Sequence, residues 1–195
     1  MKTRLLLKIG ILALQGAYQA HATCLTQLGV AYQWVKHPKD LASIDALILP
    51  GGESSVLLSL LQENSLFSAL QSFKKPILGT CAGAILLAQT VESPSQASLG
   101  HIAMTITRNA YGRQLASHIS MGTWQATSPT QPLEIVLIRA PIIRSLDAST
   151  VKVLVTDNHG HPVGVQQGCY LAMCFHPELS DSTLVHQYFL GEISP

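Results

Sequence analysis

The stretch PILGTCAGAILLA, residues 76–88, combines a short apolar segment, a cysteine and a second apolar segment. We expect a buried strand over Ile77–Gly79, a tight turn carrying Cys81, and a helix over Gly83–Gln89. At a helix N-terminus, free N–H groups and the helix dipole favour a cysteine thiolate. Glycines flank Cys81 as G-x-C-x-G, the cysteine counterpart of the G-x-S-x-G nucleophile elbow. The stretch therefore predicts a nucleophilic cysteine at the end of a strand.

Segments of strand length alternate with helical segments through the first half of the chain. The expected strands are Lys8–Leu14, Val30–Lys36 and Ala46–Leu49, and the expected helices are Tyr18–Leu28, Ser55–Leu61 and Leu66–Phe73. Such β-α-β-α alternation predicts an α/β fold in which a mostly parallel central sheet is flanked by helices. The first and third strands are continuously apolar, as expected of strands buried on both faces.

The second half is dominated by strands. We expect them at Ile102–Arg108, Leu133–Arg139, Val151–Thr156, Pro162–Gln166 and Tyr170–Phe175, with a hairpin turn at 158–161. A closing helix is expected over Ser180–Leu190, with Ser180 as its N-cap. We therefore predict one domain, residues 1–195, whose α/β sheet carries an antiparallel strand extension.

Composition and charge exclude several classes of function. The 195 residues are 47% hydrophobic and only 12% charged, with a net charge of +1 and no basic or acidic run. Binding to nucleic acid or to a membrane surface therefore has no electrostatic support. The N-terminal apolar run is interrupted by Lys8 and has no clean cleavage site, so we favour a first strand over a signal peptide and expect a cytoplasmic protein.

The four cysteines form no C-x-x-C pair, which argues against a zinc ribbon or a dithiol site. Cys24, Cys169 and Cys174 are expected to be small buried hydrophobic residues. His159 and His161 could in principle bind a metal, but no carboxylate or thiol is suitably spaced beside them. The sequence therefore predicts no metal site.

A nucleophilic cysteine needs a base, and the segment CFHPEL at 174–179 offers one. Pro177 favours an extended His176, and in an extended chain His176 and Glu178 point to the same side. Glu178 could then orient the imidazole toward Cys81. The tripeptide alone fits a polar strand end and turn better, and only the cysteine elbow elsewhere in the chain favours the catalytic interpretation. The other seven histidines are interpreted as surface or structural residues: His21, His37, His101, His118, His159, His161 and His186.

The segment LPGGESS, residues 49–55, follows an expected strand directly. Its two glycines allow a sharp turn with exposed N–H groups, which could form an oxyanion hole together with the N–H of Ala82. Loops at the carboxyl ends of parallel strands meet in one crevice, so this loop and the Cys81 turn can come together. The segment is not a phosphate-binding loop, because no Lys-Ser/Thr follows at the required spacing. A plain turn capped by Ser54 or Ser55 is an alternative interpretation.

Two arginines lie at expected strand ends. Arg108 and Arg139 fit solvated surface charges, or carboxylate anchors through the forked guanidinium geometry.

Together these motifs resemble those of class I, triad-type glutamine amidotransferases. Six of them in order resemble the glutaminase subunits of pyridoxal 5′-phosphate synthases: LALQGA (12–17), PGGES (50–54), GTCAG (79–83), RNAYGRQ (108–114), IRAP (138–141) and CFHPEL (174–179). The first, fourth and fifth motifs are the specific ones, since the others are shared by the whole class. Thr107 and Ala172–Met173 depart from the usual pattern, which affects fine tuning and not the triad.

The resemblance implies a role for each matching residue. Cys81 would be the nucleophile, His176 the base and Glu178 its orienting partner, with an oxyanion hole at Gly52 and Ala82. The residues implied to bind glutamine are Gly51, Gly52, Glu53, Arg108, Ile138 and Arg139. Gln15 would support the site or a subunit interface.

The implied reaction is hydrolysis of L-glutamine to L-glutamate and ammonia, with no metal or organic cofactor. The resemblance further implies a hetero-oligomer in which the glutaminase is activated by a synthase subunit, which also receives the ammonia. Two alternatives stay open at this point: a glutaminase for histidine or nucleotide synthesis, and a non-catalytic, amidotransferase-like regulatory module.

Overall fold

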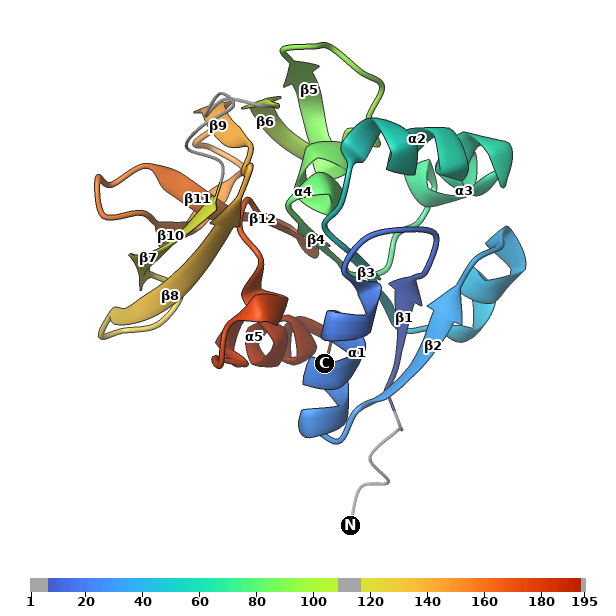
Figure 1. Ribbon diagram of the computed structural model, residues 1–195, viewed down its shortest axis with the longest axis horizontal. Coiled ribbons are helices and arrows are strands. Elements are labelled where there is room, and N and C mark those ends of the chain that lie inside the picture. The colour runs from blue at the N-terminus through green and yellow to red at the C-terminus, as the bar shows by residue number, and fades with distance from the viewer. Residues whose placement is uncertain (1–6, 109–116, 194–195) are drawn as a thin grey trace.

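The computed structural model describes residues 7–108 and 117–193, and its centre is a nine-stranded mixed sheet (Figure 1). Five neighbouring strands are parallel, in the order β2-β1-β3-β4-β12. Their bounds are β1 (Lys8–Leu12), β2 (Ala31–Val35), β3 (Ala46–Leu49), β4 (Ile77–Thr80) and β12 (Tyr170–Met173). β3 and β4 are buried along their whole length, which is why their sequences are continuously apolar. The predicted α/β class with a mostly parallel centre is confirmed.

The antiparallel extension continues the same sheet. β12 pairs with β11, followed by β10, β7 and β8 at the edge. These strands are β7 (Ser117–Trp124), β8 (Gln131–Ile138), β10 (Lys152–Thr156) and β11 (Pro162–Gln167). The predicted hairpin turn at 158–161 joins β10 to β11, with Gly160 in a left-handed conformation at φ +83°. β7 was not predicted, because most of its first residues are exposed and offer little apolar pattern.

A second, three-stranded sheet lies beside the first and was also missed in part. It has the order β5-β6-β9, with β5 (Ala88–Glu92), β6 (Ile102–Thr107) and β9 (Ile142–Leu146). The expected helix over Gly83–Gln89 is wrong at its end, since the helix stops at Leu87 and β5 begins at once. No glycine, proline or polar turn separates the two elements, so the sequence contained no signal for the change.

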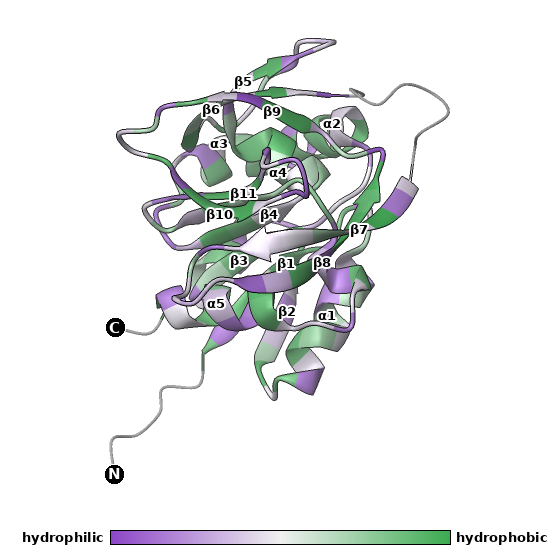
Figure 2. Cartoon of the chain, turned by 90° about the vertical axis from the view of Figure 1, so that its left-hand side faces the viewer, coloured by the Kyte–Doolittle hydropathy of each residue, from purple (hydrophilic) through white to green (hydrophobic). Residues whose placement is uncertain are grey.

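Helices cover both faces of the large sheet. The α-helices are α1 (Tyr18–Gln27), α2 (Ser54–Glu63), α3 (Leu66–Gln71), α4 (Ala82–Leu87) and α5 (Leu184–Ile193), and the 3-10 turns are η1 (Pro38–Ser43) and η2 (Pro177–Leu179). α1 and α5 lie on one face, whereas α2, α3 and α4 lie on the other with the small sheet (Figures 1 and 2). The described part of the chain has no helix with the length and apolar character needed to cross a membrane.

Two local predictions are corrected. The last helix begins at Leu184, not at Ser180, because Pro177 opens η2 and Ser180 instead ends it. The hydroxyl of Ser182 accepts a hydrogen bond from the N–H of Leu184 at 3.3 Å. Cys24 and Cys174 are buried as expected, but Cys169 is only partly buried, and its thiol donates to the carbonyl of Lys74 at 3.7 Å.

Candidate active site

Cys81 occupies a strained turn between β4 and α4. Its backbone has φ +48° and ψ −101°, a conformation that residues with a Cβ rarely adopt. Two backbone hydrogen bonds hold Cys81 in this conformation. Its N–H donates to the carbonyl of Met173 at 2.8 Å, and its carbonyl accepts from the N–H of Ile85 at 3.1 Å. This is the sharp strand-to-helix elbow that the sequence predicts.

The flanking glycines make the elbow possible by allowing close packing. A Cβ on Gly83 would overlap the carbonyl oxygen of Leu49, and a Cβ on Gly79 would come within 2.6 Å of the Gly83 carbonyl. No side chain fits at either position, so β3, β4 and α4 approach each other closely only with glycine there.

His176 comes to Cys81 through the pairing of two strands. β12 lies parallel to β4 with Met173 opposite Thr80, so Cys81 and the residues after β12 meet at the same edge of the sheet. The N–H of His176 donates to the carbonyl of Val136 at 2.9 Å, which fixes the backbone. The Cys81 thiol donates to the carbonyl of Ile138 at 4.0 Å and is close enough to His176 to raise the pKa of its imidazole.

Glu178 contacts the other ring nitrogen of His176, as expected. Its Oε1 lies 2.7 Å from Nδ1 of His176, and both side chains are buried. The predicted reason for the contact is wrong, however, because Glu178 lies in the η2 turn and not in an extended segment. The missing N–H of Pro177 and its fixed φ favour the first position of such a turn, which returns the carboxylate toward the ring.

The charges of these groups are strongly coupled. Burial lowers the pKa of His176, but the hydrogen bonds with Cys81 and Glu178 and the charges of both groups raise it to about 10. Burial raises the pKa of Glu178, yet neighbouring His21 and His176 lower it overall. Because burial also lowers the pKa of His21, that ring is neutral near pH 7, and we attribute the lowering mainly to His176. At neutral pH the site therefore holds an imidazolium between the Cys81 sulfur and a carboxylate.

The loop after β3 covers the imidazole. A Cβ on Gly51 would overlap the His176 ring, and a Cβ on Gly52, where φ is +156°, would lie 2.5 Å from the amide nitrogen of Gln15. The Gln15 side chain holds the loop by donating to the carbonyl of Glu53 at 3.2 Å and accepting from its N–H at 3.4 Å. Gln15 therefore supports the site from outside it.

Glu53, and not a serine, caps α2. Its carboxylate accepts from the N–H groups of Ser55 and Val56, and it lies 3.2 Å from the Arg108 guanidinium. The open possibility of a plain turn with a serine cap is thereby corrected, since Ser54 instead donates to Gln96 at 3.3 Å. Arg108 is buried and not a solvated charge, whereas Arg139 is exposed with a left-handed backbone at φ +44°.

A cavity of about 240 Å³ opens above Cys81 and His176. It is lined by Gly16, Ala17, Gly51, Gly52, Glu53, Ser54, Cys81, Ile85, Arg108, Ile138, Arg139, His176 and Leu179. All six residues implied to bind glutamine thus face one space, with an acidic and two basic side chains beside the nucleophile. Ala82 is fully buried next to Cys81, and residues 109–114 of the RNAYGRQ motif lie outside the described residues.

Within residues 7–108 and 117–193, no group of three or more His, Cys, Asp or Glu side chains is arranged to hold a metal ion. His159 and His161 lie near each other in the β10–β11 turn, where His161 instead contacts Asp157 at 3.3 Å. Cys81 and His176, whose imidazole is charged at neutral pH, line the cavity together.

A family model described as the SNO glutamine amidotransferase family matches residues 11–194. The chain belongs to this family. Among the relatives of this amidotransferase, the pyridoxal 5′-phosphate synthase subunit PdxT of Koribacter versatilis is 46% identical over 94% of each chain. The protein of the same name from Methanocorpusculum labreanum is 45% identical over 96% of this chain and 98% of its own.

Solved structures agree with this assignment. A crystal structure of a glutamine amidotransferase is 36% identical and superimposes with a TM-score of 0.87 over 95% of this chain and 98% of its own. The structure of PurLQS from Thermotoga maritima contains a chain with a TM-score of 0.71 over 97% of this chain and 100% of its own. At 15% identity the latter shows the shared fold alone.

His21 and His186 are the residues of this amidotransferase whose position the sequence did not reveal. Both are fully buried, and Nε2 of His21 lies 3.5 Å from Oε2 of Glu178. His21 follows the LALQGA motif and His186 lies near the C-terminus, so no local spacing connects either of them with Glu178. The two histidines reach Glu178 only because α1 and α5 pack beside η2 and the end of β4.

Proposed function

We propose that this glutamine amidotransferase hydrolyses L-glutamine with Cys81 as nucleophile, His176 as base and acid, and Glu178 as orienting residue. The observation that carries the proposal is the buried hydrogen bond between His176 and Glu178, beneath a cavity that Cys81 and His176 line together. The charged imidazole beside the sulfur is the arrangement that activates cysteine nucleophiles.

Binding of the substrate follows from the charges around the cavity. An amino acid carries one carboxylate and one ammonium group. Arg108 and Arg139 offer guanidinium groups to the first, and the Glu53 carboxylate offers an acceptor to the second. The side-chain amide of glutamine would then extend toward Cys81, past Gly51, Gly52 and Ile138.

Attack by the Cys81 sulfur on the amide carbon produces a tetrahedral intermediate with negative charge on oxygen. We assign the stabilisation of that oxyanion to the N–H groups of Gly52, which lines the cavity, and of Ala82, which follows Cys81 in the chain. The His176 imidazolium donates its proton to the departing amine, releasing ammonia and leaving a glutamyl thioester.

Hydrolysis of the thioester completes the cycle. Neutral His176 removes a proton from water, which attacks the thioester carbon, and L-glutamate leaves as the thiolate and the imidazolium are restored. Glu178 keeps the imidazole in one orientation throughout. These steps use side chains, backbone N–H groups and water alone.

The relatives named pyridoxal 5′-phosphate synthase subunit PdxT support a specific destination for the ammonia. We propose that this chain assembles with a synthase subunit, which receives ammonia for the synthesis of pyridoxal 5′-phosphate in the cytoplasm. The low charge content of the chain and the exposed apolar side chains of Leu179 and Ile138 at the cavity rim are consistent with a partner that covers this opening.

The experiment that tests the function is glutamate release from L-glutamine, with and without the synthase subunit of the same organism. We expect release to require that partner and to be abolished by Cys81→Ala. Release that is strong and unaffected by the partner would instead favour a glutaminase of histidine or nucleotide synthesis. Absence of release in both conditions would favour a non-catalytic module.

A further inference from the structure

One oxygen of the Glu178 carboxylate has no ordinary partner. Oε1 accepts from His176, but Oε2 is buried and forms no hydrogen bond within the described part of the chain. Nε2 of His21 lies 3.5 Å from this oxygen. A buried carboxylate oxygen needs a donor or a positive charge to stay ionised, so the state of the His21 ring matters to the triad.

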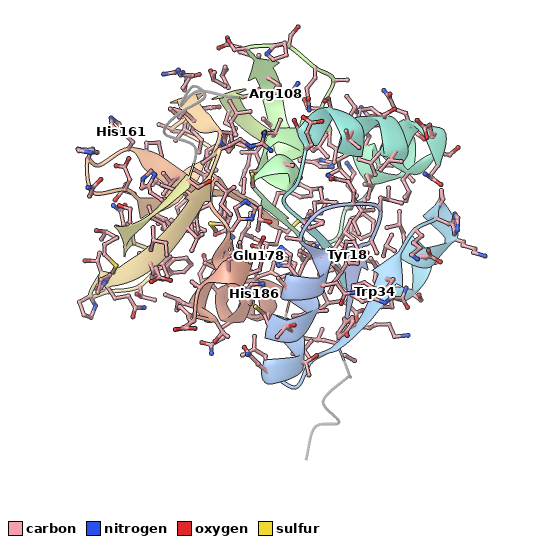
Figure 3. All side chains as sticks on the ribbon, in the orientation of Figure 1. Tyr18, Trp34, Arg108, His161, Glu178 and His186 are labelled. Atoms are coloured by element: carbon pink, nitrogen blue, oxygen red, sulfur yellow. The ribbon has the colours of Figure 1, made fainter. Side chains whose placement is uncertain are left out.

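His21 connects three elements at this point. From α1, its Nε2 lies 3.1 Å from the hydroxyl oxygen of Thr80 at the end of β4, and its Nδ1 lies 2.9 Å from Nε2 of His186 on α5. Figure 3 shows Glu178 and His186 next to each other where α5 approaches α1. The imidazole of His21 is therefore held in one plane by contacts on both nitrogens.

The contacts select one arrangement of protons. If His21 carried its proton on Nδ1, a bare Nε2 lone pair would face the Glu178 carboxylate, and His186 would be left with a buried N–H and no acceptor among the described residues. With protons on Nε2 of both rings, His186 donates to His21, and His21 directs its N–H toward Thr80 and Glu178. The two rings then leave a lone pair on Nδ1 of His186 unpaired, which is cheaper to bury than a donor.

We propose that His21 is a positioning residue of the triad, which directs an Nε2–H group at Glu178 in a tautomer fixed by His186. Its effect on Cys81 passes through Glu178 and His176, so this proposal rests on the proposed glutaminase function. The contact of 3.5 Å is long for a hydrogen bond, and catalytic contacts of this kind shorten when substrate is bound.

The surroundings of His21 agree with a neutral ring. The titratable groups that face it or Glu178 are His176, His186, Cys24 and, through His176, Cys81. Burial lowers the pKa of His21 and, with the neighbouring His21, lowers that of His186 to about 3. His21 and His186 therefore act as neutral hydrogen-bond donors in series, and His21 does not form a second ion pair with Glu178.

The test measures the pH dependence of Cys81 alkylation by iodoacetamide, with labelled peptides quantified by mass spectrometry. The reagent requires neither the partner protein nor turnover. In His21→Leu the Glu178 carboxylate loses its second donor and protonates more readily, so it supports the charged His176 less well. Alkylation of Cys81 should then begin at a higher pH, by roughly one pH unit, on the acid side of the profile. His21→Gln keeps an N–H near Glu178 and should restore the wild-type profile.

The matched control is His101→Phe, which removes a partly buried histidine that is also neutral, lies remote from the triad and is bonded to the carbonyl of Leu70. An unmoved acid limb in His21→Leu, or equal shifts in the Leu and Gln variants, would overturn the proposal. If His21→Leu does not fold, nitrogen NMR of the wild-type histidines decides, because protonation of His21 on Nδ1 contradicts the proposal directly. Failure of glutamine hydrolysis with a normal alkylation profile would count against the proposed function instead.

Discussion

Gly51 and His176 are packed so closely that a methyl group on Gly51 would overlap the imidazole ring, coming within 2.9 Å of its Nδ1. The same methyl group would lie 3.2 Å from the Cβ of Cys81. One small residue in the loop after β3 therefore sets the space available to both the nucleophile and its base.

We expect Gly51→Ala to displace His176 and to lower glutaminase kcat by about a hundredfold, since misplacement of a catalytic group by about 1 Å costs this much. Steady-state glutamate release measures the effect. Gly191→Ala is the matched control, because Gly191 is exposed in α5 with open space around its α-carbon. Comparable activity of the two variants would show that His176 tolerates the displacement.

Substitutions of Cys81 should separate catalysis from backbone strain. Cys81→Ala and Cys81→Gly both remove the nucleophile and should both abolish glutamate release. Glycine tolerates the positive φ at this position, so we expect the free energy of unfolding of the Gly variant to exceed that of the Ala variant by about 1 kcal/mol. Urea denaturation measures the difference, and a more stable Ala variant would contradict the strained elbow.

The raised pKa of His176 predicts a pH-dependent contribution to stability. The folded state favours the charged ring, so this contribution is fully present below the ordinary pKa of 6.5 and is lost as the pH rises through about 10. The stability difference between wild type and His176→Gln should therefore shrink from about pH 6 to about pH 10. Urea unfolding at both pH values checks this, and a constant difference would argue against the charged ring.

Arg108 should act mainly on substrate binding. Its buried guanidinium contacts Glu53 and faces the cavity, so we expect Arg108→Lys to raise KM roughly tenfold or more with a smaller change in kcat. Arg144→Lys is the control, since Arg144 is exposed and donates to Thr107 outside this cavity. An unchanged KM in Arg108→Lys would remove Arg108 from the glutamine site.

Gln15→Ala should weaken the site without removing any group from the cavity. The Gln15 amide is bonded to both the N–H and the carbonyl of Glu53, so its loss frees the loop that carries Gly51 and Gly52. We expect kcat/KM to fall by about tenfold. Gln33→Ala, which removes a comparable amide bonded to Asp40 and Ser43, should leave kcat/KM unchanged.

Much of the fold and of the site could be predicted because the signals were local. The apolar strands β1, β3 and β4 and the elbow around Cys81 follow from a few adjacent residues. β5 and β7 could not be predicted, since β5 follows a helix without a turn signal and β7 is largely exposed. The contacts of His21 were missed for a different reason: they are made only when α1, α5 and η2 pack together.

Pairing of β12 with β4 means that the nucleophile and its base follow the same ends of two neighbouring strands, although they belong to distant parts of the chain. The same arrangement delays the onset of chemistry during biosynthesis. A nascent chain presents Cys81 early, but it cannot consume glutamine until the C-terminal strand has left the ribosome and inserted beside β4.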